Sequence, residues 1–287
     1  MTRLAGPLRD SDGPAAVSDL TRFARLGGGR RVWAVAAIHG EADRLQRLHV
    51  TLAARLEPGD RVVYLGNYLG WGPDIRGTLD ELVRYRRALM SRRDAFACDV
   101  AFLRGAQEEM WHKLLQLQLA LEPGRVLAWM IKRGVDATIR AYGADPENGL
   151  GCTRGGVVAL TRWTGTLREA MRRNPGHYEL LHGLKQAAFT EAGGILFVHC
   201  GLDPNRPLTA QGDALWWGSS GFAAIAEPYA GFRRVVRGYD PRRGGVSETG
   251  VSETGVTVTI DGGSGFGGPL VAVCLDPRSG MVDRIEA

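Results

Sequence analysis

The sequence predicts an α/β fold, in which helices cover the faces of sheets, from two observations. Apolar, β-branched runs at residues 31–37 and 61–65 alternate with segments of helical periodicity at 41–56 and 79–92. Such alternation is typical of parallel strands that are connected by helices. In the last third of the chain, short turns separate several apolar runs, which favours a second, partly antiparallel sheet.

Four of the apolar runs end abruptly at a glycine beside a short polar or small residue. Open α/β sheets place their sites at the carboxyl ends of strands, so these junctions predict one site assembled from several strand ends. The four junctions are Ile38-His39-Gly40, Leu65-Gly66-Asn67, Leu103-Arg104-Gly105 and Val198-His199-Cys200-Gly201.

The elements of the first half of the chain follow one another at short intervals. Leucines at positions 45, 48, 52 and 56 share one face of the first expected helix, and Pro58-Gly59 ends that helix. A Gly-rich loop from Gly66 to Gly77 follows the second strand. We expect a third strand over 96–103 and a helix over 108–121.

Residues 122–190 interrupt this alternation with helical patterns and several Arg residues. We interpret them as a helical cap inserted into a single domain that spans residues 30–287. The cap helices are expected around 123–133, 135–142 and 166–187, and further strands at 194–199, 233–238, 256–260 and 269–275.

Residues 1–29 mix Gly, Pro, Asp and Ser and end in three glycines. We expect a tail or linker with one short helix from Val17 to Leu26, which Ser18 caps. The sequence Gly-Val-Ser-Glu-Thr occurs twice in succession over 245–254. Two copies are too few for a repeat architecture, so the duplication is interpreted as a lengthened hairpin loop.

The composition is that of an ordinary globular protein, with 287 residues, 44% hydrophobic, and a net charge of +5. This charge is spread along the chain without a basic stripe and interleaved aromatics, so no nucleic-acid partner is indicated. Four cysteines lie far apart without a CxxC pair, which argues against a zinc knuckle or a disulfide framework. No run reaches the roughly 18 apolar residues of a membrane span, and no signal-peptide pattern is present. We therefore expect a cytoplasmic protein with no membrane association.

The junctions resemble the motifs of the metallophosphoesterase (calcineurin-like) superfamily, in particular its bacterial serine/threonine protein phosphatase-like members. The family motifs read G-D-x-H-G, G-D-x-x-D-R-G, R-G-N-H-E, V-H-A/C-G and G-H-T-P. Here the chain reads A-A-I-H-G, G-N-Y-L-G-W-G, R-G-A-Q-E, V-H-C-G and G-Y-D-P, in the same order and at matching intervals. The resemblance covers residues 30–287. It implies a four-layer α/β/β/α sandwich of two mixed sheets flanked by helices, with a helical cap insertion.

In that family, two metal ions activate a bridging hydroxide for attack on a phosphoester, and a histidine acts as general acid. Only His39 and His199 keep the family's residue type, and both carboxylates of the metal pair are lost. We therefore expect no catalytic residue and no cofactor. By resemblance, the six ligand positions are Ala37, His39, Asn67, Ala106, His199 and Tyr239, and the general-acid position is Gln107.

If a metal site remains, the resemblance implies one divalent ion such as Mn, Fe or Zn, held by His39, Asn67 and His199. Among the family's phosphate-binding arginines only Arg104 is kept, because Trp71-Gly72 and Gly218 replace the others. Arg104 has an alternative role, since it can equally form an ion pair with one of the acidic residues at 108 and 109.

The other site positions have structural interpretations too. His39 can bond the backbone of its turn, and His199 can be a satisfied core side chain. Asn67 can act as a hydrogen-bonding strut, and Tyr239 can fill the space of a missing metal. We expect Trp129, Trp163 and Trp216 to be core residues and His49, His112, His177 and His182 to lie on the surface.

Three functions are compatible with this sequence. The leading interpretation is a pseudophosphatase that binds a phosphoprotein or another phosphate-containing ligand in a regulatory role. The second is a residual metal-dependent phosphoesterase that acts slowly on a phosphoprotein or nucleotide. The third is a metal-free phosphate- or nucleotide-binding module in which Arg104, His39 and His199 hold the anion. Metal analysis separates the second from the others, and titration with a phosphate ligand separates the third from the first.

Overall fold

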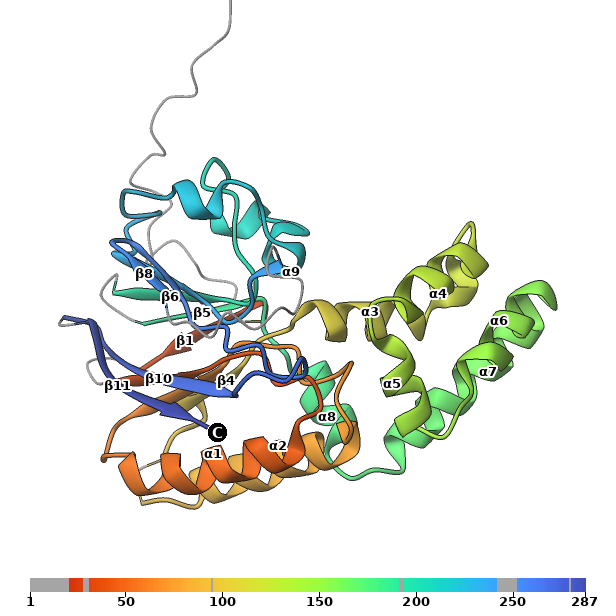
Figure 1. Cartoon of the computed structure of the whole chain (residues 1–287), viewed down its shortest axis with the longest axis horizontal. Helices are drawn as coiled ribbons and strands as arrows, with labels where there is room; N and C mark the ends of the chain where they lie inside the picture. The colour runs from red at the N-terminus through yellow and green to blue at the C-terminus, as the bar shows by residue number, and fades with distance from the viewer. Residues whose placement is uncertain (1–20, 28–30, 94, 191–193, 242–251, 279) are drawn as a thin grey trace, which may run out of the picture.

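Two mixed sheets lie face to face in the computed structural model, with helices outside them and a cap that projects to one side (Figure 1). The structure describes residues 21–27, 31–93, 95–190, 194–241, 252–278 and 280–287. This arrangement is the expected sandwich of two mixed sheets flanked by helices.

The first sheet has five strands in the order β11-β10-β2-β3-β4. Strands β2 (Val32–Val35), β3 (Arg61–Tyr64) and β4 (Val100–Phe102) are parallel to one another. Strand β10 (Val271–Asp276) runs antiparallel to both β2 and the terminal strand β11 (Gly280–Glu286). The parallel half is the part that we predicted as alternating strands and helices. The strand expected over 96–103 is shorter than predicted, because residues 97–99 form a 3₁₀ turn.

The second sheet has six strands in the order β1-β5-β6-β7-β9-β8. It contains both parallel and antiparallel pairs, so it is mixed. The prediction of a helix from Val17 to Leu26 is wrong for residues 23–26, which form a strand beside β5; residues 17–20 lie outside the described ones. The strands are β1 (Phe23–Leu26), β5 (Ala187–Thr190), β6 (Ile195–Val198), β7 (Arg234–Arg237), β8 (Ser252–Thr254) and β9 (Thr257–Thr259).

The two faces of each strand belong to different cores, because successive side chains point to opposite sides of a sheet. In β2, Ala34 contributes to the core between the two sheets, whereas Trp33 and Val35 contribute to the core beneath the outer helices. All three side chains are buried. Burial on both faces explains why this strand reads as a continuous apolar run. The same run delivers its last residues to the edge where the candidate site lies.

Helices α1 (Ala42–Arg55) and α2 (Ile75–Met90) cover the outer face of the five-stranded sheet (Figure 1). Asp74 caps α2, since its carboxylate accepts a hydrogen bond from the Gly77 N–H at 2.8 Å. Helix α3 (Ala106–Leu114) ends earlier than the predicted helix over 108–121. A short helix, α9 (Ala214–Trp217), lies on the side of the six-stranded sheet. The 3₁₀ turns are Ala97–Asp99, Leu117–Leu119, Leu208–Ala210 and Phe222–Ala224.

The cap is a set of helices between β4 and β5, of which several project away from the sheets (Figure 1). The prediction of one helix over 166–187 is wrong, because a turn separates two helices there and residue 187 already begins β5. Trp163 is buried inside the cap, as expected for a core residue. The cap helices are α4 (Pro123–Ile131), α5 (Val135–Ala141), α6 (Pro146–Arg154), α7 (Gly156–Arg172) and α8 (His177–His182).

Two of the four histidines that we expected on the surface are buried. His49 lies between α1 and α2, where Nδ1 is 2.5 Å from Glu81 and Nε2 is 2.8 Å from the Tyr64 hydroxyl. His177 bonds the Tyr142 hydroxyl at 2.9 Å and Asp80 at 3.0 Å. Burial lowers the pKa of both histidines, with the carboxylates acting in the opposite sense. The surface prediction holds for His112 and His182, which are exposed.

Candidate functional site

The carboxyl ends of strands from both sheets meet at one edge, as the four junctions predicted. The Ala37 N–H, just after β2, donates to the Gly238 carbonyl at 3.1 Å, which ties the two sheets together. The His39 N–H donates to the Asn67 carbonyl at 2.7 Å. Three non-glycine residues near this edge have left-handed backbone, namely His39, Asn67 and Trp71. Such conformations cost on the order of 1 kcal/mol each and gather at functional sites.

Asn67 is a strut within this edge. Its Oδ1 accepts a hydrogen bond from the Gln107 backbone N–H at 3.0 Å, and its Nδ2 lies 3.3 Å from Nε2 of His39. The amide therefore connects the loop after β3 with the first turn of α3 and with His39. Since both sides of the amide have partners, Asn67 fulfils the structural role considered from the sequence.

Glu108 holds the same loop by its backbone. Its buried carboxylate accepts hydrogen bonds from the N–H groups of Asn67, Tyr68, Leu69 and Gly105 at 2.8–3.0 Å. Burial raises the pKa of Glu108, and the four backbone donors act in the opposite sense. The acidic residue of the R-G-A-Q-E segment thus fixes the geometry of the site without entering it.

The two histidines that the chain retains are neutral and enclosed. Nδ1 of His199 lies 2.6 Å from the Leu65 carbonyl, and its buried Nε2 has no hydrogen-bond partner. Nδ1 of His39 is buried and makes no hydrogen bond of ordinary geometry. Burial lowers the pKa of His39 to about 3, with the neighbouring His199 acting in the same sense. Burial also lowers the pKa of His199 to about 4, so both imidazoles are uncharged at neutral pH.

Tyr239, which the sequence resemblance aligns with a histidine, lies against both histidines. Its ring is nearly parallel to that of His199, with ring centroids 5.5 Å apart and an interplanar angle of 6°. It meets the His39 ring edge-on at 5.7 Å, and Phe266 meets His39 at 5.3 Å. Burial raises the pKa of Tyr239 to about 12, so the phenol is neutral. We call His39, Asn67, His199 and Tyr239 the strand-end centre.

The donors of the strand-end centre do not fit a pair of metal ions. Ala37 and Ala106 carry no donor atom, and the oxygen of Asn67 already accepts a hydrogen bond from α3. The remaining donors are two neutral imidazoles and a phenol, without a carboxylate to balance the charge of two divalent ions. Among the described residues, no group of three or more His, Cys, Asp or Glu side chains is arranged to hold a metal ion.

Arg104 is turned toward an acidic neighbour. Its Nη1 lies 3.2 Å from Oε2 of Glu109, so in this structure Arg104 forms an ion pair, the alternative to phosphate binding considered from the sequence. Glu109 also lies 3.5 Å from Lys113. The pairing is with Glu109 because the carboxylate of Glu108 is already committed to four backbone donors. Arg104 does not line the cleft described next.

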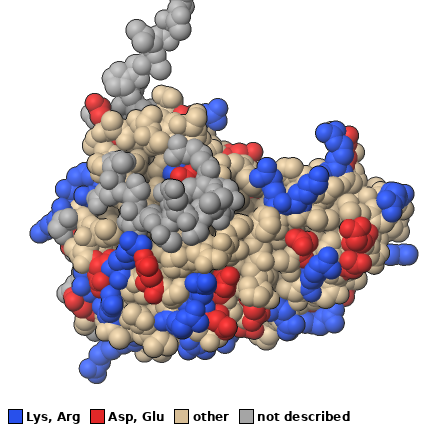
Figure 2. Space-filling model, viewed as in Figure 1, with Lys and Arg blue, Asp and Glu red and all other residues tan. Residues whose placement is uncertain are grey.

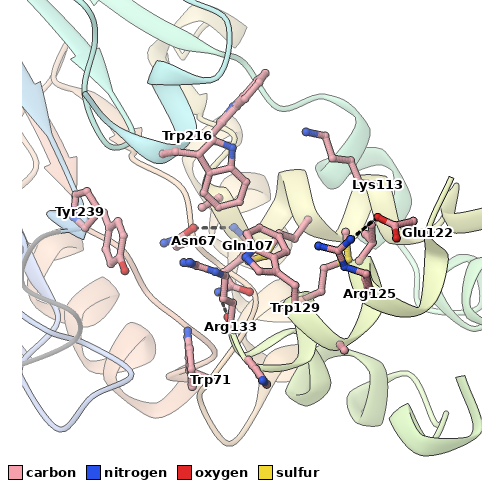
Figure 3. A pocket seen from close by; sticks show the side chains of 18 residues that line it. Asn67, Trp71, Gln107, Lys113, Glu122, Arg125, Trp129, Arg133, Trp216 and Tyr239 are labelled. Atoms are coloured by element: carbon pink, nitrogen blue, oxygen red, sulfur yellow. Dashed lines mark hydrogen bonds and ion pairs between the residues drawn. The ribbon is translucent and has the colours of Figure 1, made fainter. Parts of the chain in front are cut away.

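A cleft of about 970 Å³ lies between the strand-end centre and the cap (Figure 3). Among the predicted site positions, Asn67, Ala106, Gln107 and Tyr239 line it. Ala37, His39 and His199 lie behind this surface, and each of them is buried. We call this space the cap cleft. Its lining also includes Trp71, Lys113, Arg125, Trp129, Lys132, Arg133, Trp216 and Trp217.

Gln107 connects the centre to the cap. Its Nε2 donates to the Arg133 carbonyl at 2.7 Å, whereas its Oε1 is buried without a partner. Two further bonds join the same surfaces: the Trp71 N–H donates to the Gly134 carbonyl at 3.3 Å, and the Gly70 N–H donates to Thr138 Oγ1 at 3.1 Å. Gly134 must be glycine here, because it has left-handed backbone and a Cβ would come within 2.6 Å of the Trp71 indole.

Aromatic and cationic side chains of the cap cleft were not recognised from the sequence. Trp129 was expected in the core, but 40% of its surface is exposed, and Trp216 is half-buried in the cleft wall. The Arg133 guanidinium lies 4.8 Å from the Trp129 ring centroid. Two basic residues follow the apolar run over 126–131, and this pattern could have indicated the cleft. It was interpreted only as the amphipathic pattern of a cap helix.

Comparison with known proteins bears on the fold alone. No family model and no curated protein matches the sequence. A solved structure described as a putative diadenosine tetraphosphatase matches with a TM-score of 0.52 and 18% identity, over 93% of this chain and 98% of that one. The chain has a calcineurin-like metallophosphoesterase fold.

Two further solved structures have the same fold at lower identity. A protein serine/threonine phosphatase from Saccharomyces cerevisiae matches with a TM-score of 0.50 and 14% identity, over 92% of this chain and 82% of that one. A point mutant of a cold-active protein tyrosine phosphatase matches with the same TM-score and identity, over 94% of this chain and 84% of that one. At such identities the likeness concerns the fold, and the chemistry depends on this chain's own side chains.

Proposed function

We propose that this protein is a pseudophosphatase of the bacterial serine/threonine phosphatase-like type, which binds a phosphate-containing ligand or a phosphoprotein without hydrolysing it. The observation that carries this proposal is the stacking of Tyr239 on His199 in a centre that contains no carboxylate. Four Lys or Arg side chains line the cleft in front of the centre, which supports binding of an anion there.

The two-metal chemistry that the sequence resemblance implies depends on groups that this centre lacks. Two divalent ions held close together need anionic ligands, and the donors here are neutral at physiological pH. Gln107, at the general-acid position, carries an amide that has no proton to give in that pH range. Binding of a phosphate group needs neither of these functions, because cations and N–H donors suffice.

A residual phosphoesterase is the second candidate, and one observation favours it. Nε2 of His199 is buried without a hydrogen-bond partner, and an unpaired imidazole nitrogen is a potential ligand for one divalent ion such as Mn, Fe or Zn. His39 and Asn67 are further donors of the strand-end centre. An ion in that position would compete with the Tyr239 ring for space.

Turnover of an aryl phosphate separates the two candidates. We expect the purified protein to release no more aryl alcohol with Mn²⁺ than with EDTA, and its melting temperature to be the same in both. A His199→Asn variant serves as the control, since it removes the nitrogen that would bind the ion. Mn²⁺-dependent turnover that His199→Asn abolishes would establish the residual enzyme and overturn the pseudophosphatase.

None of the helices in the described part of the chain is long and apolar enough to cross a bilayer. On the face shown in Figure 2, Lys and Arg alternate with Asp and Glu, and the described residues form no continuous basic band there. As the sequence led us to expect, we propose a cytoplasmic role with a protein or small-molecule partner.

A further inference from the structure

We propose that the cap cleft binds a nucleoside di- or triphosphate, with the base against Trp129 and Trp217 and the phosphates on Lys132 and Arg133. This inference rests on the proposed function, because it names the phosphate-containing ligand. It involves side chains of the cap and of α9, which lie outside all five motif segments.

The aromatic part of the cleft is a pair of indoles from two different regions. Trp129 belongs to α4 of the cap and Trp217 to α9, and their ring centroids are 5.6 Å apart at an interplanar angle of 68°. Met110 and Met130 lie behind the cleft surface and are buried in the core. The two partly exposed indoles therefore form the wall against which a planar heterocycle can stack.

The cationic part of the cleft has more positive charge than its own acids balance. Four of the lining residues are Lys or Arg, and only one, Glu122, is acidic. Glu122 forms an ion pair with Arg125 at 2.7 Å, and Lys113 is beside Glu109. Lys132 and Arg133 have no carboxylate within ion-pair distance among the described residues, so their charges are available to an anion.

The two parts are adjacent, which favours a ligand that has both a ring and several negative charges. The Arg133 guanidinium is 4.8 Å from the centroid of the Trp129 ring, and Figure 3 shows Arg133 between Trp129 and the side of the cleft that carries Tyr239. A guanidinium against an indole keeps its N–H edges free for phosphate oxygens.

Volume and charge favour a nucleotide over a phosphopeptide. A cleft of about 970 Å³ is within the range of small-molecule sites, whereas an extended peptide buries a longer groove. Two unbalanced cations next to each other in the chain suit a di- or triphosphate better than the single phosphate of a modified side chain. Tighter binding of a phosphotyrosine peptide is therefore the competing result in the experiment below.

The test is calorimetric titration of the full chain in EDTA with ATP, tripolyphosphate, adenosine and a phosphotyrosine peptide. We expect ATP to bind about tenfold more tightly than tripolyphosphate or adenosine, because it uses both parts of the cleft. Trp129→Ala should weaken ATP binding about tenfold and leave tripolyphosphate binding unchanged, and Trp129→Phe should restore most of the loss. Lys132→Ala should weaken ATP and tripolyphosphate equally and reduce the salt dependence of both.

Two exposed residues of the cap outside the cleft provide matched controls. Arg162→Ala removes a cation from α7, and Leu121→Ala removes an apolar side chain from the surface. Neither should change ATP affinity. If ATP binds no more tightly than tripolyphosphate, or if Trp129→Ala binds ATP as the parent does, the inference is wrong. Tighter binding of the phosphotyrosine peptide than of ATP would also overturn it.

These results are independent of the test of the proposed function. A protein that neither hydrolyses aryl phosphate nor binds ATP would contradict the nucleotide and leave the pseudophosphatase in place. A protein that hydrolyses ATP in a Mn²⁺-dependent manner would contradict the pseudophosphatase, while the affinities of the Trp129 and Lys132 variants would still decide where the nucleotide binds.

Discussion

The strand-end centre and the cap cleft are neighbours with opposite properties. In the centre, the side chains are neutral and turned toward one another, and Tyr239 occupies the space in front of His199. In the cleft, the indoles and cations are partly exposed, and Lys132 and Arg133 have no acidic partner among the described residues. The comparison supports the proposal that the cleft binds a ligand beside a centre that does not transform it.

The largest expected effect comes from restoring the metal ligands and the general acid of the strand-end centre. Ala37→Asp, Asn67→Asp, Ala106→Asn, Gln107→His and Tyr239→His together should create two divalent-metal sites and some phosphoesterase activity. Each single change should do little, because ligands of one site act together. Without metal, the new carboxylates repel each other, so the variant with all five substitutions should have a lower melting temperature than the parent. Metal titration by calorimetry and aryl phosphate turnover measure both effects.

The phosphoesterase activity of the variant with all five substitutions should stay weak, since Trp71 and Gly218 still replace phosphate-binding arginines. If the unmodified protein already binds two ions as this variant does, the contrast between centre and cleft fails.

The second effect concerns the residue that shapes the centre. Glu108→Ala leaves four buried N–H groups without an acceptor, so we expect a loss of at least about 3 kcal/mol in the free energy of unfolding. Glu122→Ala removes an exposed ion pair with Arg125 and should cost about 1 kcal/mol or less. Urea unfolding measures both. Equal losses would mean that the loop after β3 is held by other contacts.

The third effect is the part of the pH dependence of stability that comes from His199. His199 is neutral when folded, with a pKa of about 4, and titrates near 6.5 when unfolded. Its stabilising contribution is therefore complete above pH 6.5 and decreases toward pH 4, because the unfolded chain binds the proton first. The slope for one histidine is about 1.4 kcal/mol per pH unit. His199→Asn should lose that part of the slope, and His182→Asn, at an exposed position, should keep it.

The smallest effect tests the contact between the two regions. Gln107→Ala removes the hydrogen bond to the Arg133 carbonyl and should cost about 1 kcal/mol. Hydrogen exchange should become faster at the backbone of residues 133–135, next to the cleft. Gln116→Ala, at an exposed position outside this contact, is the control. Unchanged exchange in Gln107→Ala would show that other contacts hold this part of the cap.

The sequence predicted the strand-end centre better than the cap cleft for a physical reason. Strands buried on both faces give continuous apolar runs, and the glycine after each run marks where it ends, so the junctions at His39, Asn67 and His199 were visible. Trp129 was misplaced because an aromatic residue on an amphipathic helix has the same pattern whether its face meets a core or a cleft.

Contacts between distant segments account for the other errors. His49 was expected on the surface because its partners, Tyr64 and Glu81, are 15 and 32 positions away. The strand at Phe23–Leu26 was expected as a helix because four residues are too short for periodicity to decide, and its pairing partner is β5.

The metal content of the purified protein tests most directly whether the strand-end centre binds divalent metal ions. Elemental analysis after purification without chelator, from cells supplied with Mn, Fe and Zn, gives the number of ions per chain. We predict well below one tightly bound ion per chain, because the strand-end centre offers neutral imidazoles, an amide that is already bonded and a neutral phenol. Two ions per chain, lost on His199→Asn, would contradict the pseudophosphatase.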